Sequence, residues 1–220
     1  MVIAPTLLDG PPEEVLAWAL GRFPRIALAC SFGAEDVVLV HMASFLKPGV
    51  DVFYLDTHLH FPETYATRDI IQKRYSITLH RVEPQLSLKE QEAQHGPKLW
   101  ERDPDLCCRL RKVEPLKGFL QGFDAWITGI RREQSPTRAQ AQSIQWDASF
   151  SLWKINPLVT WTTKDVWDYI HRHQIPYHPL HDRHYPSIGC LPCTSPVLPG
   201  EDPRSGRWRG KEKKECGLHA

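Results

Sequence analysis

Four cysteines occur as two tight pairs, Cys107-Cys108 and Cys190-Leu191-Pro192-Cys193. Thiolates in such pairs commonly bind zinc or an iron–sulfur cluster. Neighbouring Cα atoms lie about 3.8 Å apart, below the roughly 4.4–6.8 Å of most disulfides, so a Cys107–Cys108 disulfide would be strained. Zinc sites normally use two CxxC-like pairs, whereas adjacent thiolates can bind different irons of one cluster. We therefore predict an iron–sulfur cluster; a tetrahedral zinc site and unrelated core cysteines are the alternatives.

A fifth cysteine, Cys216, lies in a C-terminal segment that also contains Lys211, Lys213 and Lys214. Nearby cations favour the thiolate, which is the nucleophilic form of cysteine. Cys216 is therefore a candidate nucleophile, although an exposed cysteine in a frayed tail would have the same surroundings. Cys30 ends an apolar run and is interpreted as a small core residue.

Arginines gather in two segments, one with Arg131, Arg132 and Arg138 and the other with Arg204 and Arg207. The planar guanidinium group makes bidentate, charge-assisted bonds to oxyanions, so these residues could bind phosphate or sulfate. Ordinary solvated surface charge is the alternative for each of them.

Lys112 follows Cys108 by four residues. If residues 106–119 are helical, this spacing is about one turn and places the ammonium group on the Cys108 face. A cation there would stabilise an anionic metal centre and attract an anionic ligand. The alternative is a structural salt bridge to Glu114 or Asp105.

Strands and helices must position these groups. Apolar runs predict strands over residues 26–30, 50–55, 77–82, 125–128 and 152–155, and amphipathic segments predict helices over 13–20, 37–46, 62–75 and 164–173. Thr162 or Thr163 could cap the last helix, with Asp165 in its first turn. The alternation predicts an α/β fold with a doubly wound, mainly parallel sheet. We expect one domain over residues 1–220, in which residues 186–220 form a C-terminal extension that folds over the site.

In such a sheet, ligands bind beyond the carboxyl ends of the strands. The segments 31–36, 56–58 and 129–132 follow three of the predicted strands, so we expect them to meet at one crevice. Gly33 could relax the first of these turns, Ser31 could donate its hydroxyl group, and the following helix N-terminus could face a phosphate. Glu35 and Asp36 could equally be first-turn residues that complement the helix dipole.

Bulk composition excludes several classes of protein. The formal net charge of +1 leaves no global field for nucleic acid. No apolar run approaches the length of a membrane span, and residues 1–12 have no charged segment before an apolar one, so we expect neither a membrane anchor nor a signal peptide. A chain of 220 residues does not need disulfides to form a core. We expect a cytoplasmic protein.

Four segments together resemble the adenylyl-sulfate and phosphoadenylyl-sulfate reductases. They are the modified PP-loop SFGAED, a second motif LDTHLHFPET, an arginine motif TGIRREQSPTR, and the tail KECGLH, at residues 31–36, 55–64, 128–138 and 214–219. The paired cysteines are similar to the iron–sulfur branch of this family, which typically reduces adenylyl sulfate. The chain departs from the family pattern at His58, where many members have glycine, and in its shorter first loop.

The resemblance implies a PP-loop, adenine nucleotide alpha hydrolase-like fold and a set of site residues. It implies a [4Fe–4S] cluster on Cys107, Cys108, Cys190 and Cys193, and Cys216 as the catalytic nucleophile. It implies contacts to the sulfonucleotide from Ser31, Gly33, Leu55, Lys112, Gly129, Arg131, Arg138, Arg204 and Arg207.

The activity implied is thioredoxin-dependent reduction of adenylyl sulfate to sulfite and AMP in assimilatory sulfate reduction and cysteine biosynthesis. The reaction would pass through an S-sulfocysteine on Cys216, and thioredoxin would form a transient mixed disulfide. The family also implies a homo-oligomer. Phosphoadenylyl sulfate, or both nucleotides, are alternative substrates. Two other functions remain open, a PP-loop adenylyltransferase and a nucleotide-binding redox sensor.

Overall fold

The computed structural model describes residues 9–213 and 215–218, so Lys214 and His219 of the C-terminal motif lie outside the described residues. The chain divides into two compact units. The first contains the segments up to residue 54, 66–80 and 122–178, and the second contains 55–65, 81–121 and 179 onward. All predicted cluster ligands and the candidate nucleophile belong to the second unit.

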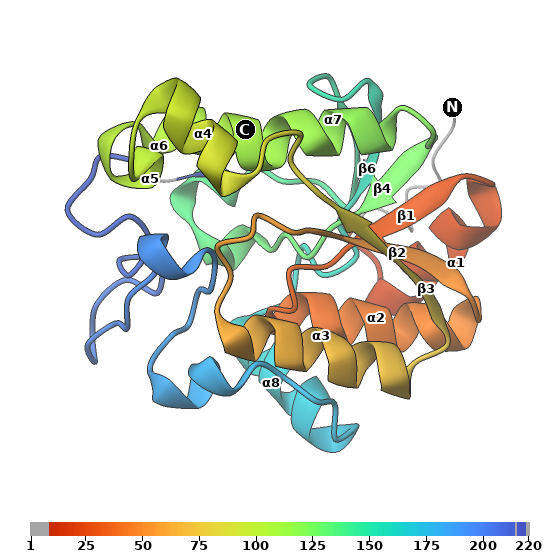
Figure 1. Ribbon diagram of the computed structural model, residues 1–220. Coiled ribbons are helices and arrows are strands. Elements are labelled where there is room, and N and C mark those ends of the chain that lie inside the picture. Colours follow the sequence, from red (N-terminus) through yellow and green to blue (C-terminus); the bar gives the residue numbers. More distant parts are fainter. Residues whose placement is uncertain (1–8, 214, 219–220) are drawn as a thin grey trace. The chain divides into compact units, whose positions relative to one another are not determined.

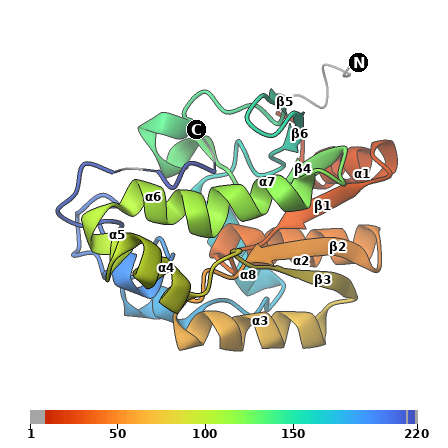
Figure 2. The same ribbon diagram turned by 45° about the horizontal axis from the view of Figure 1, so that its top comes forward.

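The sheet has six strands in the order β3-β2-β1-β4-β6-β5 (Figures 1 and 2). Strand β1 pairs in parallel with β2 and β4, and β4 pairs in parallel with β6, whereas β5 is antiparallel to β6. The prediction of a mainly parallel, doubly wound sheet is confirmed. The strands are β1 Ile26–Ala29, β2 Val50–Leu55, β3 Ile77–Val82, β4 Ala125–Ile127, β5 Ile144–Asp147 and β6 Leu152–Ile155.

Strand order reverses at β1, which lies between β2 and β4. Such a reversal is the topological switch point of an open α/β sheet, beyond whose carboxyl edge ligands bind. Two of the loops predicted to form the site, 31–36 and 129–132, leave the sheet there.

Helices of the first unit bury the apolar face of these strands. Helix α2 packs against α1 and α8 on one face of the sheet (Figure 1). Their shared core holds Val38, Leu39 and Ile170, which are fully or almost fully buried. The helices are α1 Pro12–Arg22, α2 Ala34–Leu46, α3 Pro62–Arg74 and α8 Thr163–Arg172.

Sequence patterns located most of these elements correctly. Thr162 caps α8 and forms a capping box with Asp165, as its position predicts. Helix α2 begins at Ala34, three residues before the expected start, and includes Glu35 and Asp36 in its first turn. Strand β5 was not predicted, because it is a short edge strand whose Trp146 is exposed and therefore has no continuous apolar pattern.

The second unit carries the cysteine ligands on short helices. The predicted helix over 106–119 is α6, Pro104–Cys108, continued by a π-helical segment, Arg109–Val113, and by α7, Glu114–Leu120. Asp103 caps α6 by accepting a hydrogen bond from the amide of Leu106. The π-helix is rare and occurs frequently at functional sites. Two further helices precede it, α4 Leu88–His95 and α5 Leu99–Arg102.

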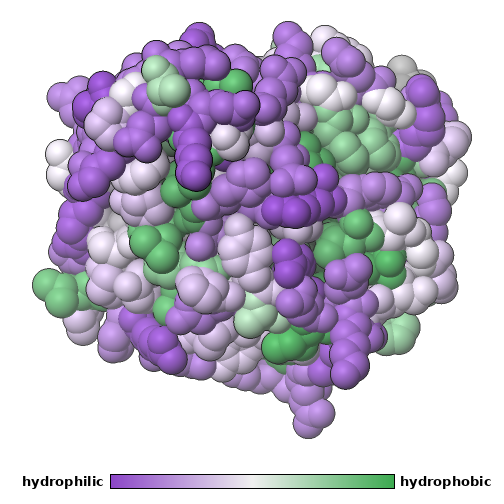
Figure 3. Space-filling model, in the orientation of Figure 1, coloured by the Kyte–Doolittle hydropathy of each residue, from purple (hydrophilic) through white to green (hydrophobic). Residues whose placement is uncertain are grey.

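One face of the molecule can be judged by its hydropathy. The face drawn in Figure 3 is mostly hydrophilic, with hydrophobic groups scattered between polar ones. In the described part of the chain, no helix combines the length and the apolar character needed to cross a bilayer.

Candidate functional site

The two cysteine pairs lie together in the second unit. Cys107 and Cys108 end α6, whereas Cys190 directly precedes the 3₁₀ turn Leu191–Cys193 and Cys193 is its last residue. All four are free thiols, three of them buried and Cys193 half-buried. Burial, reinforced by the neighbouring cysteines, raises the pKa of Cys107 to about 12 and that of Cys193 to about 11. The four sulfurs therefore share one environment that requires a cation to hold them as thiolates.

The donor set consists of four cysteine thiols, which both zinc and an iron–sulfur cluster accept. Two of them are adjacent at the end of α6, and adjacent thiolates can bind different irons of one cluster.

A buried network surrounds the cysteines, and its central residue, Arg111, was missed by the sequence analysis. Arg111 lies in the π-helical segment, and its guanidinium donates to the carbonyl oxygen of Thr57 (2.7 Å) and to Gln91 Oε1 (3.0 Å). The hydroxyl of Thr57 is in turn 3.3 Å from Cys190 Sγ. Arg111 therefore ties the motif after β2 to both cysteine pairs. Its only signal in the sequence is its place between Cys108 and Lys112.

Lys112 faces the sulfur-rich centre, as predicted. Burial by itself lowers the pKa of Lys112, but the nearby Cys190, Cys216 and Cys108 outweigh it and raise the pKa above its ordinary value. The alternative partners are engaged elsewhere, because Asp105 pairs with Lys213 and Glu114 pairs with Arg109. Lys112 and Cys216 are thereby brought into the same environment as the cluster ligands.

Arg207 is held beside the same centre and has spare donor capacity. Its guanidinium lies so close to Gly189 that a Cβ there would overlap Nη2. Arg207 stacks on Trp208 at 4.6 Å, and its charge acts on Lys112 and Cys193. In the described part of the chain, Arg207 Nε and Trp208 Nε1 are buried donors without an acceptor. Buried donors normally have partners, so these two point to an anionic ligand or sulfur acceptor.

Arg204 is engaged with the tail. Its Nη2 lies 3.0 Å from Glu215 Oε2, and both side chains are less than one-fifth exposed. Lys213 pairs with Asp105. These pairs hold the segment that carries Cys216 against the rest of the second unit.

Leu55 ends β2, and its carbonyl oxygen accepts a hydrogen bond from His60 Nε2 at 2.8 Å. The next residue, Asp56, is fully buried and bonded to Tyr65 and Arg81. Burial opposes ionisation, but these donors hold the pKa of Asp56 below its ordinary value. His58 has a positive φ of 59°, a left-handed backbone conformation that glycine adopts more readily than histidine.

In the first unit, the loop after β1 differs in detail from expectation. Gly33 has an extended backbone (φ −72°), and the left-handed residue is Phe32 (φ 64°), so Gly33 is not the residue that relaxes the turn. The amide and hydroxyl of Ser31 both donate to Asp36 Oδ2, at 2.6 and 2.7 Å. Burial raises the pKa of Asp36 to about 6. The Asp36 carboxylate therefore accepts hydrogen bonds from the two Ser31 donors that were expected to face an anionic ligand.

The loop after β4 packs against this first loop. A Cβ on Gly129 would lie 2.6 Å from Asp36 Oδ1, so only glycine permits the approach. Arg131 is buried and donates to Glu35 Oε1 (2.8 Å) and Glu133 Oε2 (2.9 Å). Arg138 is half-buried, and its Nη1 donates to Gln134 Oε1 at 2.6 Å. The structure thus brings Ser31, Gly129 and Arg138 onto neighbouring loops but pairs Arg131 with carboxylates.

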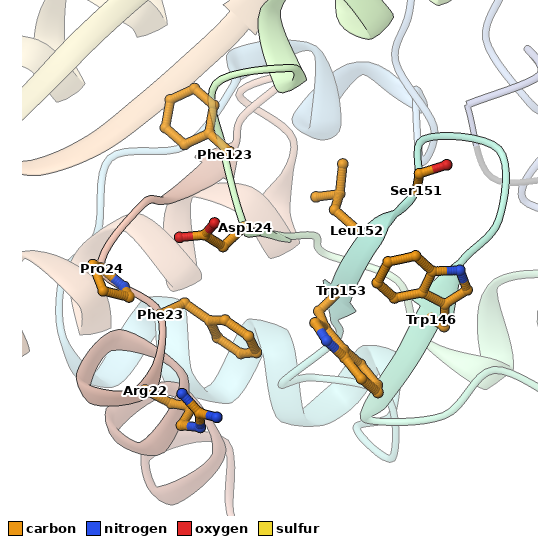
Figure 4. Close-up of a pocket in the computed structure, with 9 residues that line it drawn as sticks. All are labelled: Arg22, Phe23, Pro24, Phe123, Asp124, Trp146, Ser151, Leu152 and Trp153. Carbon is orange, nitrogen blue, oxygen red and sulfur yellow. The ribbon is translucent and has the colours of Figure 1, made fainter. Parts of the chain in front are cut away.

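A pocket in the first unit lies elsewhere. Phe23 and Pro24 precede β1, Asp124 precedes β4, and Leu152 and Trp153 begin β6, so these lining residues mark the amino-terminal ends of the strands (Figure 4). Ligands of this fold class bind at the opposite edge. None of the predicted site residues lines this pocket.

Known proteins resemble this chain in sequence and in fold. Residues 25–196 match the model of the phosphoadenosine phosphosulfate reductase domain. An adenosine 5′-phosphosulfate reductase of Anoxybacillus flavithermus is 52% identical over 208 residues, covering 94% of this chain and 88% of the relative. A phosphoadenosine 5′-phosphosulfate reductase of Gloeobacter violaceus is 50% identical over 216 residues, covering 96% and 90%.

Among solved structures, the phosphoadenylyl-sulfate reductase of Candida auris in a phosphate complex superposes with a TM-score of 0.72 at 33% identity, covering 86% of this chain and 91% of that one. Family match, identity and fold agree over most of the sequence. The chain belongs to the phosphoadenosine phosphosulfate reductase family.

Proposed function

We propose that this protein reduces adenylyl sulfate to sulfite and AMP, with Cys216 as the nucleophile. The observation that carries the proposal is the meeting of Cys216, Lys112 and Arg207 beside two cysteine pairs in one compact unit. A thiol next to fixed cations is suited to attack an anionic sulfur centre. The names of the close relatives, which include adenosine 5′-phosphosulfate reductases, support the same reaction.

The four paired cysteines would hold a [4Fe–4S] cluster. Four largely buried cysteine thiols, two of them adjacent in the chain, fit such a group better than one zinc ion. Lys112 and the buried Nε–H of Arg207 offer positive charge and a hydrogen-bond donor to an anionic centre. When bound, the cluster would supply a compact anionic, sulfur-rich centre that sets the electrostatics of the sulfate pocket.

The proposed reaction starts with the Cys216 thiolate. It attacks the sulfate sulfur, the bond from sulfur to the phosphate oxygen breaks with its electron pair on AMP, and an S-sulfocysteine forms. Lys112 and the arginines stabilise the charge that grows on the leaving oxygen. A thiolate of reduced thioredoxin then attacks Cys216 Sγ and releases sulfite, and its second thiol resolves the mixed disulfide. Two thioredoxin thiols are oxidised for each sulfite formed.

The proposed substrate contacts are the backbone groups near Ser31, Gly33, Leu55 and Gly129 and the cations Lys112, Arg138, Arg204 and Arg207. For Arg131 we propose a supporting role, because Glu35 and Glu133 already pair with it. A cytoplasmic location, a homo-oligomeric state and a single domain over residues 1–220 stay predictions.

The two candidate substrates differ in a 3′-phosphate, which phosphoadenylyl sulfate carries and adenylyl sulfate lacks. A relative that is 50% identical is named a phosphoadenosine 5′-phosphosulfate reductase, so the two nucleotides must be compared directly. The test is sulfite release by anaerobically purified, cluster-loaded protein with reduced thioredoxin. We expect a higher kcat/KM for adenylyl sulfate than for phosphoadenylyl sulfate. Absence of thioredoxin-dependent sulfite with either nucleotide would refute the proposed reaction. ATP cleavage without a thiol donor would favour an adenylyltransferase, and nucleotide binding without turnover would favour a redox sensor.

A further inference from the structure

Arg111 is a buried cation, 2% exposed, that forms no ion pair with a carboxylate among the described residues. Its guanidinium donates to the carbonyl oxygens of Thr57 and Leu86, at 2.7 and 3.3 Å, and to Gln91 Oε1 at 3.0 Å. The fourth partner is His58, whose Nδ1 lies 3.3 Å from Arg111 Nη2. A buried charge is costly unless an opposite charge lies near it, so Arg111 needs an anionic counterpart.

The paired cysteines supply most of that counterpart. Burial lowers the pKa of Arg111, whereas Cys107 and Cys190 act in the opposite direction. Asp56 also raises the pKa of Arg111, but its carboxylate accepts a hydrogen bond from Arg81 Nε at 2.7 Å. The charge of Arg111 therefore acts chiefly on the cysteine-lined centre of the second unit.

His58 lies between this arginine and a carboxylate. Its Nδ1 faces Arg111, and its Nε2 lies 2.7 Å from Glu83 Oε1. A guanidinium can only donate and an ionised carboxylate can only accept, so Nδ1 must accept and Nε2 must carry the proton. Turning the ring over would set carbon atoms against both partners. The neutral imidazole of His58 therefore links Arg111 to Glu83 in one orientation.

The backbone around His58 contacts the second cysteine pair. His58 has a φ of 59°, a left-handed conformation that is uncommon for residues with a side chain. On one side of it, Thr57 Oγ1 lies 3.3 Å from Cys190 Sγ. On the other side, the carbonyl oxygen of Leu59 accepts a hydrogen bond from the amide of Leu191 at 2.7 Å. The turn at His58 thus joins the segment of Cys190 to the arginine that follows Cys107 and Cys108.

A neutral acceptor suits an arginine whose charge acts on a metal centre. A carboxylate in the same place would orient Arg111 but would also neutralise its charge. Glu83 instead accepts from His58 and pairs with Arg81 Nη2 at 3.1 Å. The imidazole fixes one N–H of Arg111 and keeps the Glu83 carboxylate one ring away from it.

We propose that His58 is a positioning residue that holds Arg111 beside the four paired cysteines and thereby slows the loss of the metal centre they bind. This inference rests on the proposed function only in that these cysteines bind a metal centre. His58 itself need not touch that centre. It acts by orienting Arg111, whose positive charge stabilises the thiolate ligands.

The test measures how fast an excess of an iron chelator bleaches the visible absorbance of the full-length, anaerobically purified protein. Glycine and asparagine both tolerate the left-handed backbone, so neither His58→Gly nor His58→Asn strains the turn. Asparagine Oδ1 takes the place of Nδ1 and can accept from Arg111, whereas glycine offers no acceptor. We expect His58→Gly to bleach about tenfold faster than wild type, because a hydrogen bond to a charged group is lost, and His58→Asn to stay within about twofold.

Two further variants show whether the effect passes through Arg111. Glu83→Gln keeps an acceptor for Nε2 and leaves the bond to Arg111, so it is the matched control and should stay within about twofold of wild type. Arg111→Lys keeps the charge but loses the planar fork, and in this background we expect His58→Gly to change the rate less than about twofold.

A full effect of His58→Gly in the Arg111→Lys background would overturn the inference, since His58 would then act on its loop rather than through Arg111. Equal bleaching rates for His58→Gly and His58→Asn would overturn it as well. If Arg111→Lys holds no metal, the comparison of the glycine and asparagine variants decides alone.

Sulfite release and metal content separate this inference from the proposed reaction. A cluster-loaded wild type that releases no thioredoxin-dependent sulfite would refute the reaction, and the bleaching rates would still decide the role of His58. If the protein holds zinc, the proposed cluster fails. Zinc release, followed with a zinc-binding dye over the same variants, then replaces bleaching and is read in the same way.

Discussion

Arg204 Nη2 lies 3.0 Å from the carboxylate of Glu215, the residue directly before Cys216. The two side chains are largely buried, so this ion pair holds the nucleophile's segment in place more firmly than a surface pair would. The same guanidinium is proposed to bind the substrate's anionic group. Arg204 is therefore proposed both to hold the C-terminal segment in place and to bind the substrate.

Removing the carboxylate should loosen the tail. We expect Glu215→Ala to slow formation of the S-sulfocysteine about tenfold, which corresponds to about 1.4 kcal/mol, because Cys216 is no longer held by Arg204. Rapid-quench single-turnover kinetics with adenylyl sulfate measure this step. Glu212→Ala, at an exposed position of the same tail, is the control and should react at the wild-type rate. A Glu215→Ala rate within twofold of wild type would contradict the role given to the pair.

Cys216 itself should be indispensable. Cys216→Ser should abolish both the sulfonated intermediate, detected by mass spectrometry, and sulfite release, because a hydroxyl group is a far weaker nucleophile at neutral pH than a thiolate. Iron content should stay at the wild-type level. Cys30→Ala, in the core of the first unit, should keep the intermediate. Sulfite formation by Cys216→Ser at a near-normal rate would exclude the mechanism.

Metal content distinguishes the cluster from zinc. We expect about four irons and four acid-labile sulfides for each chain after anaerobic purification, because four cysteine thiols in one environment are the usual ligands of a [4Fe–4S] cluster. Cys190→Ser should lower both and bleach the visible absorbance. Stoichiometric zinc without labile sulfide would show that the thiols close on a single ion after all.

Asp36 should make stability depend on pH. Burial raises its pKa from 3.8 to about 6, so between these values the folded protein keeps a proton that the unfolded chain releases. The contribution of this group to stability is complete below about pH 4 and is lost as the pH rises through 6, by about 3 kcal/mol at most. Asparagine keeps an acceptor for Ser31 but does not ionise. The free energy of unfolding of Asp36→Asn should therefore rise relative to wild type between pH 4 and 7 in urea titrations; a constant difference would contradict the shifted pKa.

Local sequence patterns located most strands of the sheet. The predicted strands Val50–Leu55, Ile77–Val82 and Leu152–Ile155 have the same bounds in the structure, because apolar and β-branched or aromatic residues recur along each of them. Strand β5 was not predicted from the sequence, because an antiparallel edge strand buries only part of its side chains and therefore has no clear apolar pattern.

Candidate reactive groups could also be named from the chain. They are two cysteine pairs, a thiol among lysines and a series of arginines, residue types suited to metal-bound thiolates, nucleophilic attack and oxyanion binding. Only the tertiary structure decided which partner each group takes. Arg131 pairs with Glu35 and Arg138 with Gln134, while Ser31 donates to Asp36. These pairings depend on the distances between loops that lie far apart in the sequence. A shift of a few ångströms changes the partner of a hydrogen bond or ion pair, and the local sequence pattern does not reveal such a shift.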